Sequence, residues 1–452
     1  MTRPRRGARS VRRVNSLQRS GAPDDVVVVG AGAVGVAVAY ELAGRGASVT
    51  VLERGPAPAS GCSAGNAGIV GPSHVEPLAS GAAIVEGIRS LVPPPGPFGL
   101  QLRPALAPWL ARFAAAARPR RRDAAARLLQ ELAVESYERH LSIGERLDTG
   151  LVRRGFLGIY ETPAAFEEAR GHVAGDPAVE VLDGEATAAA SPALSVRPVG
   201  GILSTRDAHC DPERFVSALA AAASERGAQI VPGVEVLGIR RRGGRATTLS
   251  TTAGELAVGT VVIAAGVWSG ALAASLPIAA PLQGGKGYHL ELERAGEFGP
   301  PVYFPELRIV ATPLDGRLRV TGMLHLSGTD LSVDERRVAL IAREAARLLG
   351  DAGSRPLLRT WRGLRPCTPD GLPLIGPVPG AENVVAAFGH GQWGLQLAPV
   401  TGRLVADLLD GRRDPRLDAL SAGRFRLAAR LRREARRRPQ PVAAGGRREG
   451  GR

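Results

Sequence analysis

The sequence predicts an α/β protein with a Rossmann-type nucleotide-binding domain, and three observations lead to this class. A β-branched run, Asp25–Val29, is followed directly by a glycine-rich segment at 30–35. A helix-like stretch and a second β-branched run follow, and the second run ends in Glu53. An apolar fraction of 44% in 452 residues is enough for the cores of two or three domains. Strand, glycine turn, helix, strand and acid in this order form a dinucleotide-binding βαβ unit.

The first run is apolar without alternation, which predicts a strand buried on both faces of a parallel sheet. Its glycines permit a tight turn, close approach of the backbone to a pyrophosphate, and close contact between helix and strand. Residues 36–45 are rich in Ala, Val and Leu and predict a helix, whose N-terminus favours phosphate charge. The candidate cofactor-binding residues here are Gly30, Ala31, Gly32, Ala33, Val34 and Gly35.

The second run, 48–52, predicts the next parallel strand, and Glu53 follows it 23 residues after Gly30. An acid about 20 residues after the first glycine is the group that binds a ribose hydroxyl in this motif. An acid at this position disfavours a 2′-phosphate and therefore NADP, although Arg54 follows directly. Both residues are candidate cofactor contacts.

A second glycine-rich segment, Gly-His-Gly-Gln-Trp-Gly at 389–394, follows a strand-like run at 383–388 and precedes a helix-like run at 395–409. No strand-like run follows that helix, so the segment is half of a nucleotide-binding unit. Its helix N-terminus could face another electron-rich group. One dinucleotide site near the N-terminus, without a second, favours an FAD that stays bound over an exchangeable NAD.

The net charge of +15 is concentrated at the two ends of the chain. Residues 1–22 contribute +7 and residues 423–452 contribute +9, which leaves −1 for 23–422. A neutral body argues against a built-in nucleic-acid groove. We expect both Arg-rich tails to be solvated and disordered; binding to an anionic lipid surface or nucleic acid is the alternative.

Other sequence features bear on the compartment. The sequence has no stretch of about 18 uncharged apolar residues, so a membrane-spanning helix is not expected. The three cysteines cannot form a disulfide framework, which is typical of a reducing compartment. A cytoplasmic protein is expected. Residues 106–117, with Trp109 and Phe113 on one face, are either core or a peripheral contact at the inner face of the membrane. Scattered histidines without HxH or HExxH spacing disfavour a metal site.

Further segments carry a family resemblance over residues 24–425. They are 62–68, 260–269, 286–288, 363–371 and 389–391, together with the βαβ unit. In this order they resemble the FAD-dependent amine and amino-acid oxidoreductases typified by D-amino-acid oxidase, glycine oxidase and bacterial D-amino-acid dehydrogenase. The bacterial D-amino-acid dehydrogenases are the closest of these.

The resemblance implies further contacts to a non-covalent FAD. The segment 62–68 should approach its phosphates and ring, Val234 its adenine, and 389–395 the flavin pyrimidine, where a helix N-terminus would stabilise negative charge. Cys367 falls several residues after the cysteine that links the flavin covalently in sarcosine oxidases. The implied FAD contacts are Ser63, Asn66, Ala67, Gly68, Val234, Ala265, Gly266, Trp268, Gly389, Gly391, Gln392, Gly394 and Leu395.

Arg365 is the main catalytic candidate. An amino-acid substrate has a carboxylate that must be held in a dry pocket, and a guanidinium can bind it with two parallel hydrogen bonds. This grip would orient the substrate Cα–H for hydride transfer to flavin N5 without a strong side-chain base. The amine must then be neutral, which predicts activity that rises toward alkaline pH. A structural arginine is the alternative reading.

Tyr288 and His74 are weaker catalytic candidates. The family counterpart of Tyr288 lines the active site, and a phenol could bond the substrate carboxylate; a core aromatic is the alternative. His74 follows the 62–68 segment and could reach the substrate or lie in a surface loop. Lys286 is the only lysine in the chain, so its position predicts a need for a compact ammonium.

The resemblance also implies two interleaved domains. Segments 23–75, 196–280 and 363–422 would form the FAD-binding domain. Segments 76–195 and 281–362 would form an α+β substrate domain built on an antiparallel sheet, and 1–22 and 423–452 are the tails.

The expected function is FAD-dependent oxidation of the C–N bond of a D-amino acid to an imino acid. Water converts the imino acid to a 2-oxo acid and ammonia, and the electrons pass to a quinone or another carrier. The alternatives are an oxygen-using glycine or sarcosine oxidase, a hydroxyproline dehydrogenase, and a flavin-binding protein that acts mainly through its tails. The sequence leaves the oligomeric state open.

Overall fold

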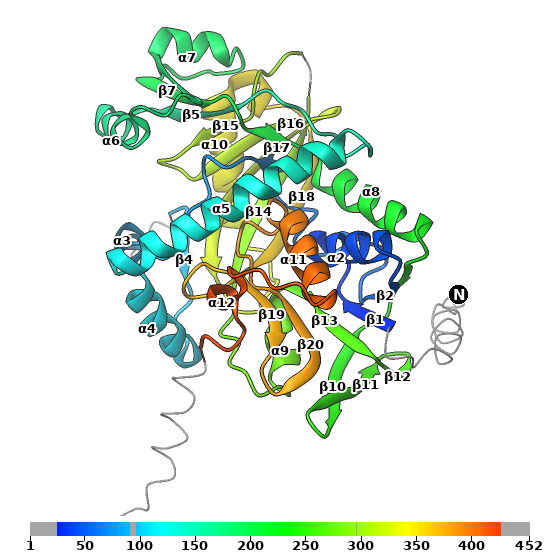
Figure 1. The fold of residues 1–452 in the computed structure, drawn as a ribbon. Helices are drawn as coiled ribbons and strands as arrows, with labels where there is room; N and C mark the ends of the chain where they lie inside the picture. The colour runs from blue at the N-terminus through cyan, green and yellow to red at the C-terminus, as the bar shows by residue number, and fades with distance from the viewer. Residues whose placement is uncertain (1–24, 91–95, 295, 426–452) are drawn as a thin grey trace, which may run out of the picture.

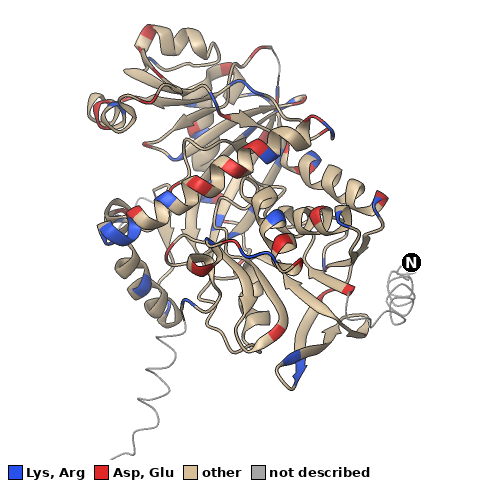
Figure 2. Cartoon of the chain, in the orientation of Figure 1, with Lys and Arg blue, Asp and Glu red and all other residues tan. Residues whose placement is uncertain are grey.

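The computed structural model describes residues 25–90, 96–294 and 296–425 (Figure 1). Segment 1–22 and nearly all of 423–452, the two predicted basic tails, lie outside the described residues. Within the described part, acidic and basic residues are interspersed, for example along the long helix α5, Pro119–Gly144 (Figure 2).

A six-stranded sheet forms the nucleotide-binding half, in the order β19-β20-β13-β1-β2-β9. Its strands are β1 Asp25–Val29, β2 Ser48–Glu53, β9 Gln229–Pro232, β13 Thr260–Ile263, β19 Leu374–Val378 and β20 Ala381–Phe388. All neighbours are parallel except the edge pair of β19 and β20. The chain order reverses between β1 and β13, where Rossmann-type sheets bind their ligands.

Strand β1 is buried on both faces, as its sequence predicts. Val26 and Val28 pack on a helical layer of α2 (Ala33–Gly44), α5, α8 (Pro212–Glu225) and α11 (Ala398–Leu409). Val27 and Val29 pack on the other face against a three-stranded sheet, β10 Val236–Arg242, β11 Arg245–Thr251 and β12 Gly254–Ala257. The predicted βαβ unit is confirmed.

A nine-stranded, mainly antiparallel sheet forms the other half, in the order β18-β14-β17-β16-β15-β5-β7-β6, with β4 paired to β17. Its strands are β4 Phe98–Leu100, β5 Phe156–Tyr160, β6 Val179–Asp183, β7 Gly200–Ser204, β14 Gln283–Glu293, β15 Val302–Phe304, β16 Ile309–Leu314, β17 Arg317–Leu326 and β18 Leu357–Cys367. Helix α10, Glu335–Gly353, covers its apolar face.

Three elements do not follow the predicted division into domains. β7 belongs to the nine-stranded sheet although 196–280 was predicted for the FAD-binding domain, and β18 continues across the boundary at 362. Helix α5 packs on α11 and shares its core through Leu129 and Leu132. The division into domains therefore stays a prediction.

Smaller elements complete the chain. β3 Ile69–Val70 pairs with β8 Ala208–His209, and the short helices are α3 Gly81–Arg89, α4 Ala107–Ala116, α6 Pro163–Val173, α7 Gly184–Ala190, α9 Ser269–Ala273 and α12 Leu417–Leu420. Trp109 and Phe113 of α4 are buried and stacked with centroids 5.1 Å apart, which confirms the core interpretation of this helix face. In the described part of the chain, no helix combines the length and apolar character needed to cross a membrane.

Candidate active site

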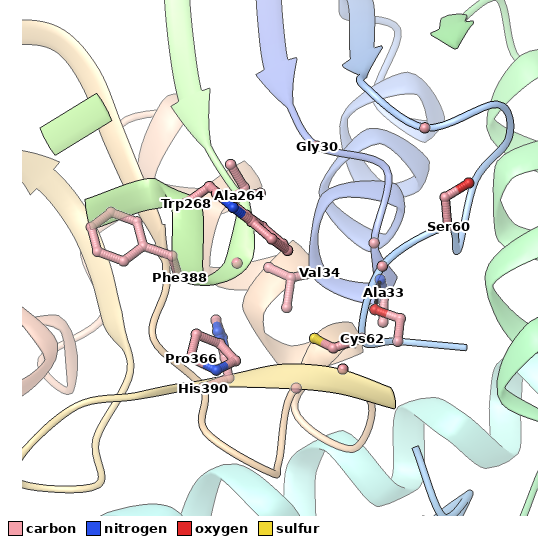
Figure 3. Close-up of a pocket in the computed structure, with 18 of the residues that line it drawn as sticks. Gly30, Ala33, Val34, Ser60, Cys62, Ala264, Trp268, Pro366, Phe388 and His390 are labelled. Carbon is pink, nitrogen blue, oxygen red and sulfur yellow. Dashed lines mark hydrogen bonds between the residues drawn. The ribbon is translucent and has the colours of Figure 1, made fainter. Parts of the chain in front are cut away.

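A cavity of about 570 Å³ lies between the two sheets (Figure 3). It opens at the carboxyl edge of the six-stranded sheet, where Gly30, Glu53, Ala264 and Gly389 end or follow their strands. Its opposite wall comes from β14 and β18. Of the residues predicted to bind cofactor, all but Ala31, Gly35, Ala67 and Gly68 line it.

Two glycines of the turn after β1, Gly30 and Gly35, have no room for a Cβ. Gly30 has φ +105°, and a Cβ on it would lie 2.7 Å from the Ala264 carbonyl oxygen. A Cβ on Gly35 would collide with the carbonyl of Gly30, which keeps α2 close to the turn. Gly32 caps α2 without a side chain, so the helix N-terminus can approach a ligand through its backbone.

Two side chains bind the backbone at this edge of the sheet. The Ser63 hydroxyl accepts a hydrogen bond from the Ala33 amide at 2.9 Å, beside the N-terminus of α2. The Glu53 carboxylate is buried and accepts from the amides of Ala31 (2.8 Å) and Gly55 (2.7 Å). A carboxylate has about four lone-pair sites, so these two bonds leave acceptor capacity for a hydroxyl group.

The far end of the cavity is lined by an arginine stacked on an indole. The Arg54 guanidinium lies 3.4 Å from the centroid of the Trp268 ring and 3.9 Å from the Glu235 carboxylate. Val234 lines the same region, but its amide already donates to the Glu53 carbonyl at 2.8 Å. Its carbonyl is therefore the group left to bond a ligand here.

The two predicted ligand loops, 62–68 and 389–395, contact each other. The Asn66 side chain donates to the Gln392 carbonyl at 3.2 Å and accepts from the Gly68 amide at 2.8 Å. Gly389 and Gly391 have φ of +85° and +56°, conformations that favour glycine. This pair of loops forms the cavity wall between the two sheets.

The helix after the second loop starts later than its sequence pattern predicts. α11 begins at Ala398 rather than at 395, with Pro399 in its first turn, where proline is favoured. The preceding turn is held by α5: Ser136 donates to the Gln396 carbonyl at 2.5 Å, and His140 Nε2 bonds the carbonyls of Leu395 and Gln396. Burial lowers the pKa of His140 to about 4.

Arg365 projects from β18 into the cavity and also borders a smaller hollow of about 20 Å³ lined by Leu78, Leu324 and Trp393. Its Nη1 donates to the Met323 carbonyl at 2.7 Å. Among the described residues, no carboxylate lies within ion-pair distance of it, and burial lowers the pKa of its guanidinium. Most of its donors thus remain for an anionic ligand.

A bulge in β17 supplies the carbonyl that holds Arg365. The register with β14 shifts between Lys286 and Tyr288, which pair with His325 and Gly322. Met323 lies in this bulge with φ +71°, a conformation that costs an L-residue about 1 to 2 kcal/mol. Strained residues of this kind cluster at functional sites.

The other two catalytic candidates have different surroundings. Tyr288 lines the cavity, but its ring packs in the core under α10 and its hydroxyl accepts from the Asp334 amide at 3.3 Å. His74 does not line the cavity. Its ring packs edge-on against Phe156, with centroids 4.8 Å apart, and burial lowers its pKa to about 4.

Sequence reasoning assigned no individual role to Cys62, Gly287 and Trp361, which are among the residues that line the cavity. A Cβ on Gly287 would lie 2.7 Å from Arg365 Cζ, so this glycine makes room for the guanidinium. Cys62 lies within the 62–68 segment, which the family resemblance had already assigned to the cofactor. No sequence pattern around Trp361 predicts that it lines the cavity. Lys286 is buried and binds Asp330 (2.8 Å) and the Ser332 carbonyl (2.8 Å), away from the cavity.

The residues around the cavity fit an FAD. The glycine cradle and helix N-terminus suit a pyrophosphate, and the buried carboxylate of Glu53 suits a ribose. The cavity extends from the Arg54 end to Arg365, which suits a long ligand with a substrate beside it. In the described part of the chain, no group of three or more His, Cys, Asp or Glu residues is placed to hold a metal ion.

Comparisons with known proteins agree with this fit. The family model DAO, FAD dependent oxidoreductase, matches residues 25–408. The D-amino acid dehydrogenase of Granulibacter bethesdensis is 32% identical over 87% of this chain and 97% of its own length. That of Xanthobacter autotrophicus is 34% identical over 89% of this chain and 100% of its own.

A solved structure shares the fold. Glycine oxidase from Geobacillus kaustophilus superposes with a TM-score of 0.69 at 27% identity, covering 88% of this chain and 98% of that one. These findings confirm the α/β fold class, the FAD dependence and the family resemblance predicted from the sequence. The chain belongs to the DAO family of FAD-dependent oxidoreductases.

Proposed function

We propose that this protein is a D-amino-acid dehydrogenase that oxidises the C–N bond of its substrate. The observation that carries the proposal is the cavity-facing guanidinium of Arg365. Within the described ranges its hydrogen-bond partner is the Met323 carbonyl, and no carboxylate pairs with it. A partly buried charge without a counter-ion suits an anionic ligand, and the carboxylate of an amino acid supplies one. Relatives named D-amino acid dehydrogenase support the substrate class.

The cofactor would be held by the groups described above. The Gly30–Gly35 turn and Ser63 would bind the pyrophosphate, Glu53 the ribose, and the carbonyl of Val234 the adenine. The loops 62–68 and 389–395 would contact the flavin end. When bound, FAD supplies the two-electron acceptor that takes a hydride from the substrate.

Arg365 would orient the substrate. Its remaining N–H donors would bind both carboxylate oxygens, and the Met323 carbonyl and Gly287 would fix the guanidinium plane. Two parallel hydrogen bonds fix the orientation of the Cα–H as well as its position.

Among the described residues, the only Asp or Glu side chains that line the cavity are Glu53 and Glu235, at its Arg54 end and not beside Arg365. His390 lines the cavity, but burial lowers its pKa to about 3 and its Nε2 bonds Thr401. The amine must therefore lose its proton to solvent before reaction, so the rate of reduction should rise toward alkaline pH. The imino product leaves and reacts with water to give a 2-oxo acid and ammonia.

The electron acceptor would be a quinone or another carrier. Use of oxygen on glycine is the second candidate, because a solved glycine oxidase shares the fold at 27% identity. Anaerobic reduction followed by admission of air distinguishes the two: reoxidation within seconds favours the oxidase, and persistent bleaching favours the dehydrogenase.

A peripheral membrane contact would fit the surface around α3 best. Val85, Ile88 and Leu102 are exposed there, the last two by 64% and 63%, and Arg89 and Arg103 lie beside them in sequence. Exposed apolar groups flanked by arginines suit an anionic lipid surface. Co-sedimentation with anionic vesicles, lost on Ile88→Glu, tests this contact.

The decisive experiment is anaerobic bleaching of the bound flavin by a panel of D-amino acids, L-amino acids, glycine, sarcosine and hydroxyprolines. Bleaching by D-amino acids, rising with pH, is expected. A flavin that only L-amino acids or only glycine reduces would contradict the proposed substrate class.

A further inference from the structure

The loop 64–67 has all four of its backbone carbonyls bound by side chains of the nine-stranded sheet. Arg319 Nη1 donates to the carbonyls of Ala64 and Asn66, both at 2.7 Å. Thr312 Oγ1 donates to the Ala67 carbonyl at 2.8 Å, and His289 Nδ1 lies 3.4 Å from the Gly65 carbonyl oxygen. We call His289, Thr312 and Arg319 the carbonyl clamp.

Most backbone amides of the same loop have no hydrogen-bond partner in the part of the chain that the structure describes. Within the described residues, the amides of Ala64, Gly65 and Ala67 donate to no protein acceptor, while Gly65 and Asn66 line the cavity. The Asn66 amide donates to the Ser63 carbonyl at 3.2 Å, so Ala64 and Gly65 carry the two successive amides without partners. Successive free amides suit an anion or another electron-rich group. FAD is such a ligand. Loop carbonyls that were free to turn toward the cavity would repel it, because both carry negative charge density.

The sheet register fixes the clamp. Arg319 pairs directly with Thr312 on β16 and with Glu291 on β14, so these side chains form one row on one face. Arg359 on β18 extends the row beyond Glu291. His289 is two residues from Glu291 and therefore points to the same face.

Glu291 keeps the clamp arginine charged inside the protein. Arg319 is 0% exposed and bonds Glu291 Oε1 through Nη2 at 2.6 Å and through Nε at 3.1 Å. A guanidinium so buried needs a counter-ion with good geometry. Arg317 and Arg359 bind the same carboxylate but donate to no carbonyl of the loop.

We propose that the carbonyl clamp presets the 64–67 loop for FAD, and that Arg319 and Thr312 are positioning residues whose target is the cofactor. The clamp turns the loop carbonyls away and leaves the amides as donors before FAD arrives. The inference rests on the assignment of this loop to FAD, and it is independent of which amino acid the enzyme oxidises.

The test is FAD affinity of the full-length chain stripped of flavin, measured by quenching of flavin fluorescence, with the melting temperature of the flavin-free protein alongside. Arg319→Lys keeps the charge but cannot span two carbonyls and Glu291, so the FAD dissociation constant should rise at least about tenfold. Thr312→Val is nearly isosteric and should raise it about threefold or more. Arg359→Met is the matched control, since it loses a Glu291 contact but no loop contact.

Each outcome decides the proposal. It stands if both clamp variants weaken FAD binding while Arg359→Met stays within about twofold of the unmodified protein at comparable melting temperature. It is overturned if Arg359→Met weakens FAD as much as Arg319→Lys does, because the cluster would then act through stability alone. If Arg319→Lys does not fold, Thr312→Val decides, and unchanged FAD affinity in that variant overturns the proposal. Absence of D-amino-acid turnover would not affect these readings.

Discussion

The two walls of the cavity are built from different kinds of group. The wall on the six-stranded sheet presents backbone: Gly30, Gly32 and the N-terminus of α2. The wall on the nine-stranded sheet works through charged side chains, above all Arg365, and through Arg319 behind it. The first wall should therefore tolerate no added Cβ, whereas the second should depend on the identity and placement of a few side chains.

The largest expected effect is on the side-chain wall. Arg365→Ala removes the proposed carboxylate anchor and should lower kcat/KM for D-amino acids about a thousandfold, because charge-assisted bonds are lost. Stopped-flow measurement of anaerobic flavin reduction checks this. FAD content should stay unchanged.

Arg362→Ala is the matched control for that experiment. Arg362 lies on the same strand, is exposed, and donates to the Leu331 carbonyl outside the cavity. Equal losses in the two variants would argue that Arg365 is structural.

Substitutions in the backbone wall should weaken FAD binding rather than substrate binding. Gly30→Ala places a Cβ against the Ala264 carbonyl in a conformation with positive φ, so FAD affinity should fall at least about a hundredfold. Gly46→Ala is the control: its φ is +82°, but no atom lies within 4 Å of the added Cβ. That variant should lose about 1 kcal/mol of stability and keep its FAD affinity. Flavin fluorescence titration separates them, and retained FAD binding in Gly30→Ala would break the comparison.

Gly287→Ala sharpens the comparison, because Gly287 is a glycine within the side-chain wall and makes room for its main side chain, Arg365. Its Cβ would displace the guanidinium of Arg365, so KM should rise about tenfold while FAD affinity stays constant. Gly238→Ala on β10 meets no atom within 4 Å and serves as control. A parallel loss of FAD would show that the displacement spreads beyond the anchor.

The last expected effect is on stability, with none on turnover, and concerns His74. Because burial lowers the pKa of this histidine to about 4 in the folded state, its neutral form stabilises the fold above pH 6.5. That stability is lost as the pH falls from about 6.5 to 4 and amounts to as much as about 3 kcal/mol.

His74→Phe should therefore flatten the dependence of the unfolding free energy on pH in this window, as urea denaturation at several pH values would measure. Turnover should not change, since His74 does not line the cavity. A fall in kcat at constant stability would instead support the catalytic assignment made from the sequence.

The sequence alone was informative where the signal is local. The βαβ unit, its glycines and Glu53 lie within 30 residues of one another, and backbone geometry dictates their types. Arg365 was identified through a motif resemblance. Its partner Met323 is held by a strand bulge, which no pattern in the sequence marked.

Long-range contacts account for what was missed. Arg319 resembles the many other arginines of the chain until the sheet register brings it beside Glu291 and under the 64–67 loop. His74 follows that loop in sequence, but packing against Phe156 takes it away from the cavity. The start of α11 was displaced because α5, distant in sequence, holds the turn before it.

The carbonyl clamp also bears on the order of events during synthesis. A nascent chain ending after Glu53 already contains the complete nucleotide motif, yet the 64–67 loop lacks Thr312 and Arg319 until β16 and β17 have emerged. Arg365 and the 389–395 loop come later still. Segments so far apart along the chain assemble slowly and late. High-affinity binding of FAD should thus be among the last steps of maturation. FAD would then bind a chain that has already folded and would not direct the folding of its sheets.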